Sequence, residues 1–356
     1  MRSETILAAP GYWRIFLAVL AGTLVSGPAS AASAAASRDA LDAAQNEASQ
    51  PVSRWITDEV GRRVAIPAEI RRIVTLSPDL TETVYALGLD ERLVGNTSEC
   101  DRPAAAKSKP HVGEPLNPSL EAIATLRPDL VLASTSINRL ETARALERLG
   151  IPVYTCDPHT VRGMLDSIRH LAELLGASPQ GTAVVARLEE RLGAVQARLA
   201  SEPVVHVLFV VWTDPLITIG QNTFLADALR WAGAESVAIS KQNWPQVNLE
   251  ELVRLQPEYI VFAGHGAETA ATELADLRAR AVWKDLAAVR AGRVVDIGEE
   301  AVRPSPGLVD AIEELARELH PEAFAEKSEI RNSKNETRLA LQPMGETHEE
   351  CRLCVR

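Results

Sequence analysis

Short apolar runs and helix-like segments alternate along most of the chain. The first half has four apolar runs bounded by turn residues or charges, in "RRIVTLSP", "RLVGNTS", "DLVLAS" and "GIPVYTC". The second half has four more, in "VVHVLFVVW", "SVAIS", "EYIVFAG" and "RVVDIG". Runs of this length are typical of strands buried on both faces, and the segments between them have helical patterns. The alternation predicts βαβ units and therefore an α/β fold with mainly parallel sheets.

The middle of the chain has a different pattern, without a strand signal. Apolar side chains recur there at spacings of three and four residues, which places them on one face of a long helix: Val185, Leu188, Leu192, Val195 and Leu199. At ~1.5 Å per residue, a helix of about 20 residues is roughly 30 Å long, which is comparable to the diameter of a small domain. We therefore predict a rigid helix that bridges two β/α regions.

Two segments on either side of this helix nearly repeat each other, "NPSLEAIATLRPDLVLAS" and "NWPQVNLEELVRLQPEYIVFAG". Glu121 of the first copy recurs as Glu250 of the second, and Pro128 recurs as Pro257, in each case 129 positions later. A leucine precedes each of these glutamates, and both copies continue into an apolar run. A repeat of this kind indicates a duplicated structural unit, and two copies predict two related lobes.

The ends of the chain differ in composition from the lobes. The N-terminus carries two arginines, the short apolar run "IFLAVLAGTLV" and the small residues "ASA", which together are typical of a secretory signal peptide. The segment after it and the C-terminal segment have few large apolar residues, which predicts disorder. We therefore expect a signal peptide (1–31), a linker (32–51), an N-terminal lobe (52–176), a bridging helix (177–202), a C-terminal lobe (203–325) and a tail (326–356).

Net charge and export narrow the class of protein. The formal net charge is −11 at pH 7, which argues against a nucleic-acid partner because phosphate binding needs clusters of Lys and Arg. An acidic protein is instead suited to a basic partner surface. No cysteine precedes Cys100, so we expect no lipid anchor at the cleavage point and a soluble product in the periplasm.

The cysteines leave one question open. An exported protein can keep disulfides, so the sequence permits a bridge between Cys100 and Cys156 without testing its geometry. Cys351 and Cys354 lie close to His348 near the C-terminus, but a zinc site needs a fourth ligand that nothing nearby supplies. We interpret this pair as two thiols in the tail and predict no metal site.

Residues that follow the predicted strands are the candidates for a ligand site, because ligands of open parallel sheets bind beyond the carboxyl ends of the strands. The first lobe contributes mainly small and polar residues, namely Ser77, Pro78, Cys100, Asp101 and Ser134. The second lobe contributes Trp212, Asp214, Trp244, His265 and Arg303. We expect these residues to line a cleft between the lobes.

Four of these side chains have two interpretations each. Trp244 lies in the polar, proline-containing loop "KQNWPQ", which favours a ligand contact over a core position. For Trp212 a core position and a ligand wall are equally consistent with the sequence. Arg303 can pair with a nearby acid or hold a polar group of the ligand, and we favour the ligand. His265 is interpreted as a turn residue rather than as a metal ligand.

No catalytic pattern accompanies these residues. The motifs GxSxG, HExxH and GxxxxGK[ST] are absent from the sequence, and the histidines are few and scattered. An exported α/β enzyme is therefore the weaker alternative. We predict a binding protein without enzymatic activity and without a cofactor.

Several of these segments, in this order, resemble the substrate-binding proteins of bacterial ABC importers. They are "ITDEVGRRVAIPAEIRRIVTLSP", the two repeat copies and the long middle helix, and they cover roughly residues 55–324. The class is the one for iron–siderophores, haem and vitamin B12, and "WPQVNLEEL" and "VRPSPGLV" are most similar to its vitamin B12 members. The resemblance implies two α/β lobes, one backbone helix between them and a ligand in the cleft.

The resemblance also implies a function and partners. We expect the protein to capture a cobalamin-like corrinoid and to deliver it, as a monomer, to the membrane subunits of an ABC importer. A ferric siderophore or haem is the alternative ligand; a siderophore would need several Arg or Tyr residues, and haem an axial Tyr or His.

Individual residues take roles from the same resemblance. Trp244 and Arg303 match positions of the vitamin B12 members, whereas Pro115 and Ser134 stand where those members have tryptophans. We include Pro115 among the candidate ligand-binding residues. One glutamate per lobe, Glu121 and Glu250, is expected to dock onto arginines of the membrane subunits.

Overall fold

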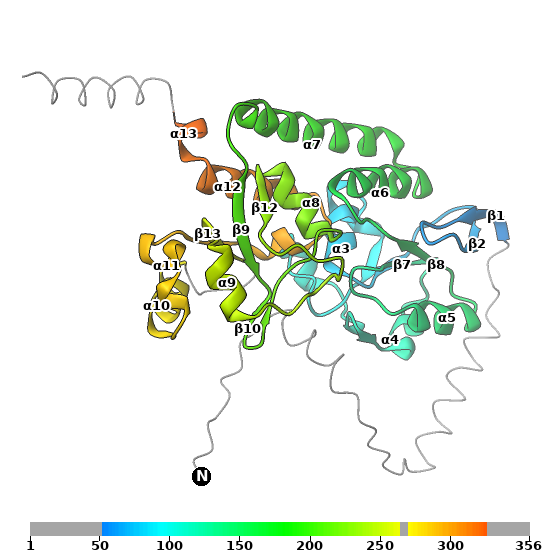
Figure 1. Cartoon of the computed structure of the whole chain (residues 1–356). Helices are drawn as coiled ribbons and strands as arrows, with labels where there is room; N and C mark the ends of the chain where they lie inside the picture. Colours follow the sequence, from blue (N-terminus) through cyan, green and yellow to red (C-terminus); the bar gives the residue numbers. More distant parts are fainter. Residues whose placement is uncertain (1–51, 264–269, 326–356) are drawn as a thin grey trace, which may run out of the picture.

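A computed structural model describes residues 52–263 and 270–325 of the chain. The predicted signal peptide, linker and tail lie outside the described residues, as do His265, Cys351 and Cys354. The described residues form two α/β lobes, with the long helix α7 running along one side of both (Figure 1). Among the described helices, none combines the length and the hydropathy that a membrane span requires.

The N-terminal lobe is built on a four-stranded parallel sheet with the strand order β4-β3-β7-β8. Nearly every residue of these strands is buried, which explains why their sequences are apolar without alternation. An antiparallel hairpin, β1–β2, precedes the sheet. The elements of this lobe are β1 (Val52–Thr57), β2 (Arg63–Pro67), β3 (Ile73–Thr75), α3 (Pro78–Ala86), η1 (Asp90–Arg92), β4 (Leu93–Gly95), η2 (Ala104–Ser108), β5 (Gly113–Glu114), β6 (Asn117–Pro118), α4 (Leu120–Thr125), β7 (Leu130–Ser134), α5 (Leu140–Arg148), β8 (Val153–Cys156) and α6 (Val161–Leu174).

The C-terminal lobe repeats this topology. Its sheet has the order β12-β9-β13-β14, so in both lobes the first strand lies between the second and the third. The helices of the sequence repeat, α4 and α9, each directly precede the third strand of their sheet. The elements of this lobe are β9 (Val205–Val210), β10 (Trp212–Thr213), β11 (Leu216–Ile217), α8 (Phe224–Trp231), β12 (Ala234–Ser236), α9 (Leu249–Leu255), β13 (Tyr259–Ala263), α10 (Ala270–Ala279), η3 (Trp283–Asp285), α11 (Ala287–Ala291), β14 (Val294–Ile297), η4 (Glu299–Val302), α12 (Leu308–Leu319) and α13 (Pro321–Phe324).

The helix α7 (Ser178–Leu199) packs against both lobes. It contacts α6 of the N-terminal lobe and α8, α12 and α13 of the C-terminal lobe. All five residues of the predicted apolar stripe are buried in a core cluster that extends into both lobes. Ion pairs add to this packing, from Arg169 to Glu189 (2.6 Å) on one side and from Arg191 to Glu313 (2.9 Å) on the other. α7 is therefore the single long helix that the sequence predicts between two lobes.

Some local features differ from the sequence-based expectation. The short antiparallel pairs β5–β6 and β10–β11 were not predicted, because strands of two residues carry no periodic signal. The two repeat helices are capped by different residues, since Asn117 of the first copy lies in β6 and α4 is capped by Ser119, whose Oγ accepts from the Ala122 backbone N–H at 3.1 Å. In the second copy Asn248 caps α9, with its Oδ1 accepting from the Glu250 backbone N–H at 2.8 Å.

Candidate functional site

A side-chain amide joins several predicted residues at the carboxyl ends of β3 and β7. Asn138 Nδ2 donates to the carbonyl oxygens of Leu76 (2.8 Å) and Pro115 (2.9 Å). Asn138 Oδ1 accepts from the backbone N–H of Ser134 at 2.8 Å. Ser77, which follows Leu76, and Ser134 are both buried in this region. Sequence analysis missed Asn138, because its partners lie up to 62 positions away and no local pattern marks it.

A buried carboxylate lies beside these hydroxyl groups. Asp79 follows Pro78 in the first turn of α3 and is 3% exposed. Burial raises the pKa of Asp79, while the neighbouring polar groups of Ser77 and Ser134 and backbone N–H groups act in the opposite direction. This edge of the N-terminal lobe therefore combines hydroxyl groups with a carboxyl group, a combination that suits neutral hydrogen-bonding groups better than anions.

Cys100 has a structural position inside the N-terminal lobe. Its Sγ lies 3.1 Å from Thr81 Oγ1 and 3.2 Å from Thr97 Oγ1, and the residue is buried. Burial raises the pKa of the Cys100 thiol. Cys100 and Cys156 are both free thiols, so the structure does not contain the bridge that the sequence left open. The next residue, Asp101, is the one that reaches the other lobe.

An ion-pair cluster connects the two lobes at Arg303. This residue is 3% exposed, and its Nη1 lies 3.3 Å from Glu82 Oε1 and 2.8 Å from Asp101 Oδ1. Ser305 Oγ donates to the other carboxylate oxygen of Glu82 at 2.6 Å. Arg303 thus has the acidic partners that were the alternative to a ligand contact. Glu82 was not expected here, because it lies inside α3 and is 221 positions from Arg303.

The two candidate tryptophans of the C-terminal lobe lie at a small β-ribbon. In the antiparallel pair β10–β11, Trp212 is opposite Ile217, and Ile217 also bridges to Gln246 on its other side. Side chains that are directly opposite in an antiparallel pair share a face. Trp212, Ile217 and Gln246 therefore share one face of the ribbon, and Trp244 lies two residues before Gln246 in the adjoining bend.

The opposite face of this ribbon packs into the lobe. Leu216 is buried in a core cluster with Leu252 of α9, whereas Trp244 is 41% exposed and Trp212 is half-buried. Ile217, on the face of Trp212, packs against a second core cluster, so the partly exposed side chains that a ligand can contact here are the two tryptophans themselves. Asp214 is exposed in the turn between β10 and β11, and its backbone carbonyl accepts from Trp212 Nε1 at 2.7 Å, which orients the indole ring.

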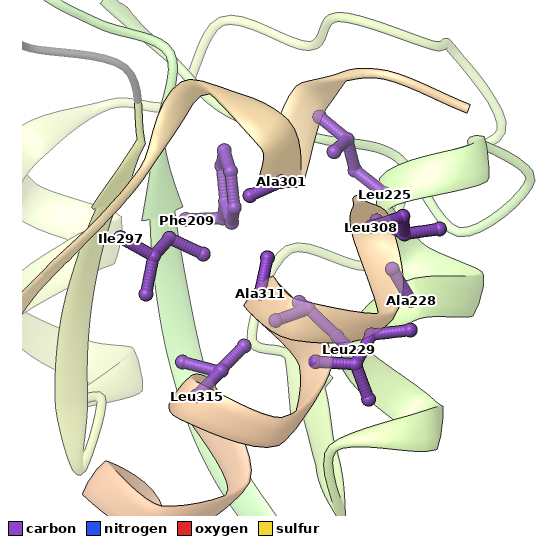
Figure 2. A pocket seen from close by; sticks show the side chains of 10 residues that line it. Phe209, Leu225, Ala228, Leu229, Ile297, Ala301, Leu308, Ala311 and Leu315 are labelled. Carbon is purple, nitrogen blue, oxygen red and sulfur yellow. The ribbon is translucent and has the colours of Figure 1, made fainter. Parts of the chain in front are cut away.

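A small cavity lies elsewhere, in the core of the C-terminal lobe (Figure 2). Apolar side chains from β9, α8, β14 and α12 line it, among them Phe209, Leu225, Ile297 and Leu315. The volume that the centre of a water molecule can occupy inside this cavity is about 10 Å³, so the cavity holds one water at most. We interpret it as a packing gap. In the described part of the chain, no group of three or more His, Cys, Asp and Glu side chains is placed to hold a metal ion.

Glu121 and Glu250 occupy equivalent positions in the two lobes. Each is the second residue of its short helix, α4 or α9, and both side chains are exposed. Each helix is followed by a residue with left-handed backbone directly before the proline, Arg127 (φ 46°) and Gln256 (φ 43°). Figure 1 shows α4 and α9 in different lobes, both in the half of the molecule away from α7.

Comparisons with known proteins agree with this architecture. A family model described as "Periplasmic binding protein" matches residues 73–301. The chain is 31% identical over 324 residues to an uncharacterized ABC transporter substrate-binding lipoprotein of Bacillus subtilis, an alignment that covers 89% of this chain and 98% of that protein.

Two solved structures have similar folds. One is the periplasmic vitamin B12-binding protein of Vibrio cholerae, with 26% identity, a TM-score of 0.62 and coverage of 72% of this chain and 99% of that one. The other is a periplasmic heme-binding protein from Roseiflexus sp. RS-1 in apo form, with 25% identity and a TM-score of 0.64. That alignment covers 71% of this chain and 99% of the heme-binding protein.

The family match extends from the first residue of β3 into η4, so it includes both parallel sheets and α7. The similarity to the Bacillus protein extends over nearly the full length of that protein. This chain therefore belongs to the periplasmic binding protein family, as an extracytoplasmic, non-enzymatic protein that binds a solute for an ABC importer.

Proposed function

We propose that this protein captures a cobalamin-like corrinoid between its lobes in the periplasm and delivers it to an ABC importer. The observation that supports this ligand most directly is the pair of partly exposed tryptophans at the β10–β11 ribbon, Trp212 in β10 and Trp244 in the loop that pairs with the segment after β11. Indole rings offer a large, rigid apolar surface, and the corrin ring is a broad macrocycle that can lie against such a wall. The similarity to vitamin B12-binding proteins is consistent with this proposal.

The N-terminal lobe supplies the opposite wall in this proposal. Ser77, Pro78, Pro115 and Ser134 belong to the cluster at the carboxyl ends of β3 and β7. All four residues are buried, so in this proposal they shape the wall from within the lobe rather than contact the ligand directly. The remaining candidates, Cys100, Asp101, Asp214 and Arg303, support these walls through contacts within the protein.

Charge favours a corrinoid over a ferric siderophore or haem. Arg303 has two carboxylate partners, and Asp79 interacts electrostatically with one of them, Glu82. An anionic chelate, or the propionates of haem, would therefore meet predominantly negative surroundings in this part of the site. A ligand with neutral amide groups avoids that repulsion.

Haem is the second candidate, because haem-binding proteins are among the solved structures with this fold. Haem iron is usually held by an axial Tyr, His, Cys or Met side chain. Among the described tyrosines, Tyr154 is buried in the N-terminal lobe, where burial raises the pKa of its phenol. Tyr259 lies in β13 beneath the guanidinium of Arg293. Tyr85, in α3, packs against the core cluster that also contains Tyr154. These environments favour none of the three as an axial ligand between the lobes.

Glu121 and Glu250 are our proposed docking residues for the membrane subunits. Their equivalent positions, their exposure and the placement of α4 and α9 away from α7 support this role. A first-turn carboxylate also stabilises its own helix by ~0.3–1 kcal/mol, which needs no partner. That effect does not explain why both lobes keep the Leu-Glu pair at the same distance from the proline.

Ligand retention tests the proposed function. The purified protein is incubated separately with cyanocobalamin, haemin and a ferric siderophore, desalted, and examined by visible spectroscopy and calorimetry. We expect about one corrinoid per chain. Trp244→Ala should weaken binding at least tenfold, or ~1.4 kcal/mol. Trp55→Ala, at a tryptophan that is 59% exposed on the β1–β2 hairpin, is the matched control and should bind normally. Retention of haemin or of the siderophore without corrinoid binding would overturn the assignment of a corrinoid as the ligand.

A further inference from the structure

Several polar contacts between the lobes lie in one small cluster, apart from the bond that the Val161 backbone N–H donates to Asp227 Oδ2 at 2.8 Å between α6 and α8. Arg303 and Ser305, in the segment between η4 and α12, both bind the carboxylate of Glu82 in α3. Arg303 also binds Asp101, in the loop after β4. A further ion pair between the lobes, Arg102 to Glu300 at 3.0 Å, involves residues that adjoin this cluster in sequence. The segment before α12 is thus tied to two elements of the N-terminal lobe at once.

The central pair of this cluster is buried. The side chain of Arg303 is 3% exposed and that of Glu82 is 9% exposed. Burial raises the pKa of Glu82, while Ser305 and Arg303 act in the opposite direction. A buried ion pair adds little net stability, because the loss of hydration offsets the attraction between the charges. The pair does disfavour any orientation of the lobes in which Arg303 or Glu82 stays buried without its partner, because an unpaired buried charge is costly.

Backbone packing restricts the same place. A Cβ added at Gly307, two residues after Ser305, would lie 3.0 Å from Glu82 Oε2. The chain before α12 therefore passes close to the Glu82 carboxylate, and a Cβ at position 307 would require a shift of a few tenths of an ångström. A small rotation of one lobe against the other would disrupt this packing together with the hydrogen bonds. The cluster thus selects one relative orientation of the lobes from those that α7 permits.

We infer that Glu82 and Arg303 are positioning residues that set the orientation of the lobes before a ligand arrives. The β10–β11 ribbon with Trp212 is then held at a fixed distance from the N-terminal wall. A preorganised binding site increases affinity, because fewer groups lose conformational entropy on binding. This gain in affinity rests on the proposed function, which places the ligand between the lobes. The orientation itself is measurable without a ligand.

Pulsed electron paramagnetic resonance on the ligand-free, full-length protein tests the inference. Nitroxide labels are placed at Glu141→Cys in α5 and Lys284→Cys in η3, two exposed positions in different lobes. Cys351→Ser and Cys354→Ser remove competing thiols outside the described residues. Cys100 and Cys156 are buried and stay unchanged. The distribution of distances between the labels reports the relative orientation of the lobes.

The variants compared are Glu82→Gln, Arg303→Gln and their combination, with Asp58→Asn as the matched control. Asp58 is also a buried carboxylate with an arginine partner, Arg62 at 2.7 Å, but the whole pair lies within the N-terminal lobe. Ser305→Ala is the milder variant, since it removes one hydrogen bond to Glu82 and keeps every charge. If the glutamine variants do not fold, the distance distribution of Ser305→Ala tests the inference in their place.

We expect narrow distributions for the parent protein and for Asp58→Asn, and broader ones for Glu82→Gln, Arg303→Gln and Ser305→Ala. The double variant should be no broader than the broader of its single variants, because both residues act through one contact. If the competent orientation falls to about a tenth of the population, the Kd for cyanocobalamin rises about tenfold. Unchanged distributions in the folded variants would overturn the inference, whatever the ligand. Broadening without cyanocobalamin binding in the parent would support the inference and overturn the proposed ligand.

Discussion

Replacement of Gly220 with alanine tests whether the tryptophan ribbon is assembled as described. The backbone N–H of Gly220 donates to the Asn243 carbonyl at 2.9 Å, which pairs the segment after β11 with the loop that carries Trp244. A Cβ at position 220 would lie 1.8 Å from the carbonyl oxygen of Gln242 and 3.0 Å from that of Ser240. Backbone atoms cannot rotate away as the end of a side chain can, so the two segments must separate.

The magnitude follows from the contacts that this separation breaks. An ordinary van der Waals contact begins at 3.4 Å, so the shortest contact, at 1.8 Å, requires a displacement of roughly 1.6 Å. That displacement breaks the bond at Gly220 and the 3.0 Å bond from Gln221 N to Ser240 O. Two hydrogen bonds at about 0.5–1.5 kcal/mol each correspond to a loss of ~1–3 kcal/mol in stability. Trp244 moves with the loop, so corrinoid affinity should fall at least tenfold, or ~1.4 kcal/mol.

Thermal unfolding and calorimetric titration with cyanocobalamin measure the two effects. Gly193→Ala in α7 is the matched control, because a Cβ at this exposed helical glycine meets nothing within 4 Å. That variant should gain about 0.5–1 kcal/mol in stability and keep its affinity. Gly220→Ala with the parent Tm and the parent affinity would refute the described pairing. A lower Tm with unchanged affinity would show that Trp244 is not a ligand contact.

Three further predictions concern other parts of the molecule. Asp79→Asn should raise stability at pH 7, because burial raises the pKa of the folded-state carboxyl. The gain should shrink as the pH falls through that raised pKa toward the ordinary value of 3.8, as denaturant unfolding at several pH values can measure. Glu121→Ala combined with Glu250→Ala should abolish transport in a reconstituted importer, leave ligand affinity intact and lower stability by no more than roughly 1–2 kcal/mol; normal transport would contradict docking. Since α7 packs against both lobes, small-angle scattering should show little change in radius of gyration on ligand binding, and a drop of several ångströms would contradict this.

The elements of the fold could be predicted because each depends on a local pattern. A strand that is buried on both faces must be apolar at nearly every position, and seven of the eight predicted runs lie on strands of the two sheets. The prediction for "SVAIS" was wrong, because the strand there is β12 (Ala234–Ser236), a half-buried strand at the end of its sheet that has no apolar run. The stripe from Val185 to Leu199 predicted α7, because a helix in contact with a core is apolar once per turn. The repeat around Glu121 and Glu250 predicted two related lobes, which share one strand order.

The candidate site was predictable in part. Strand ends led to Ser77, Ser134 and Trp212, since the topology of a parallel sheet brings these positions to one edge. The same reasoning did not reveal Asn138 or Glu82. A helical glutamate and a loop asparagine are ordinary surface residues until their partners are known.

The sequence by itself determined most strands of the two parallel sheets, the bridging helix and the duplication, because periodicity and composition express which faces of each element must be buried. The tertiary structure alone decided which polar groups meet. Asn138 reaches a carbonyl 62 positions away, and Arg303 reaches a carboxylate 221 positions away. The shared face of Trp212, Ile217 and Gln246 likewise follows from a pairing register between separate segments. Such contacts depend on how whole elements pack against one another, and no local pattern encodes that packing.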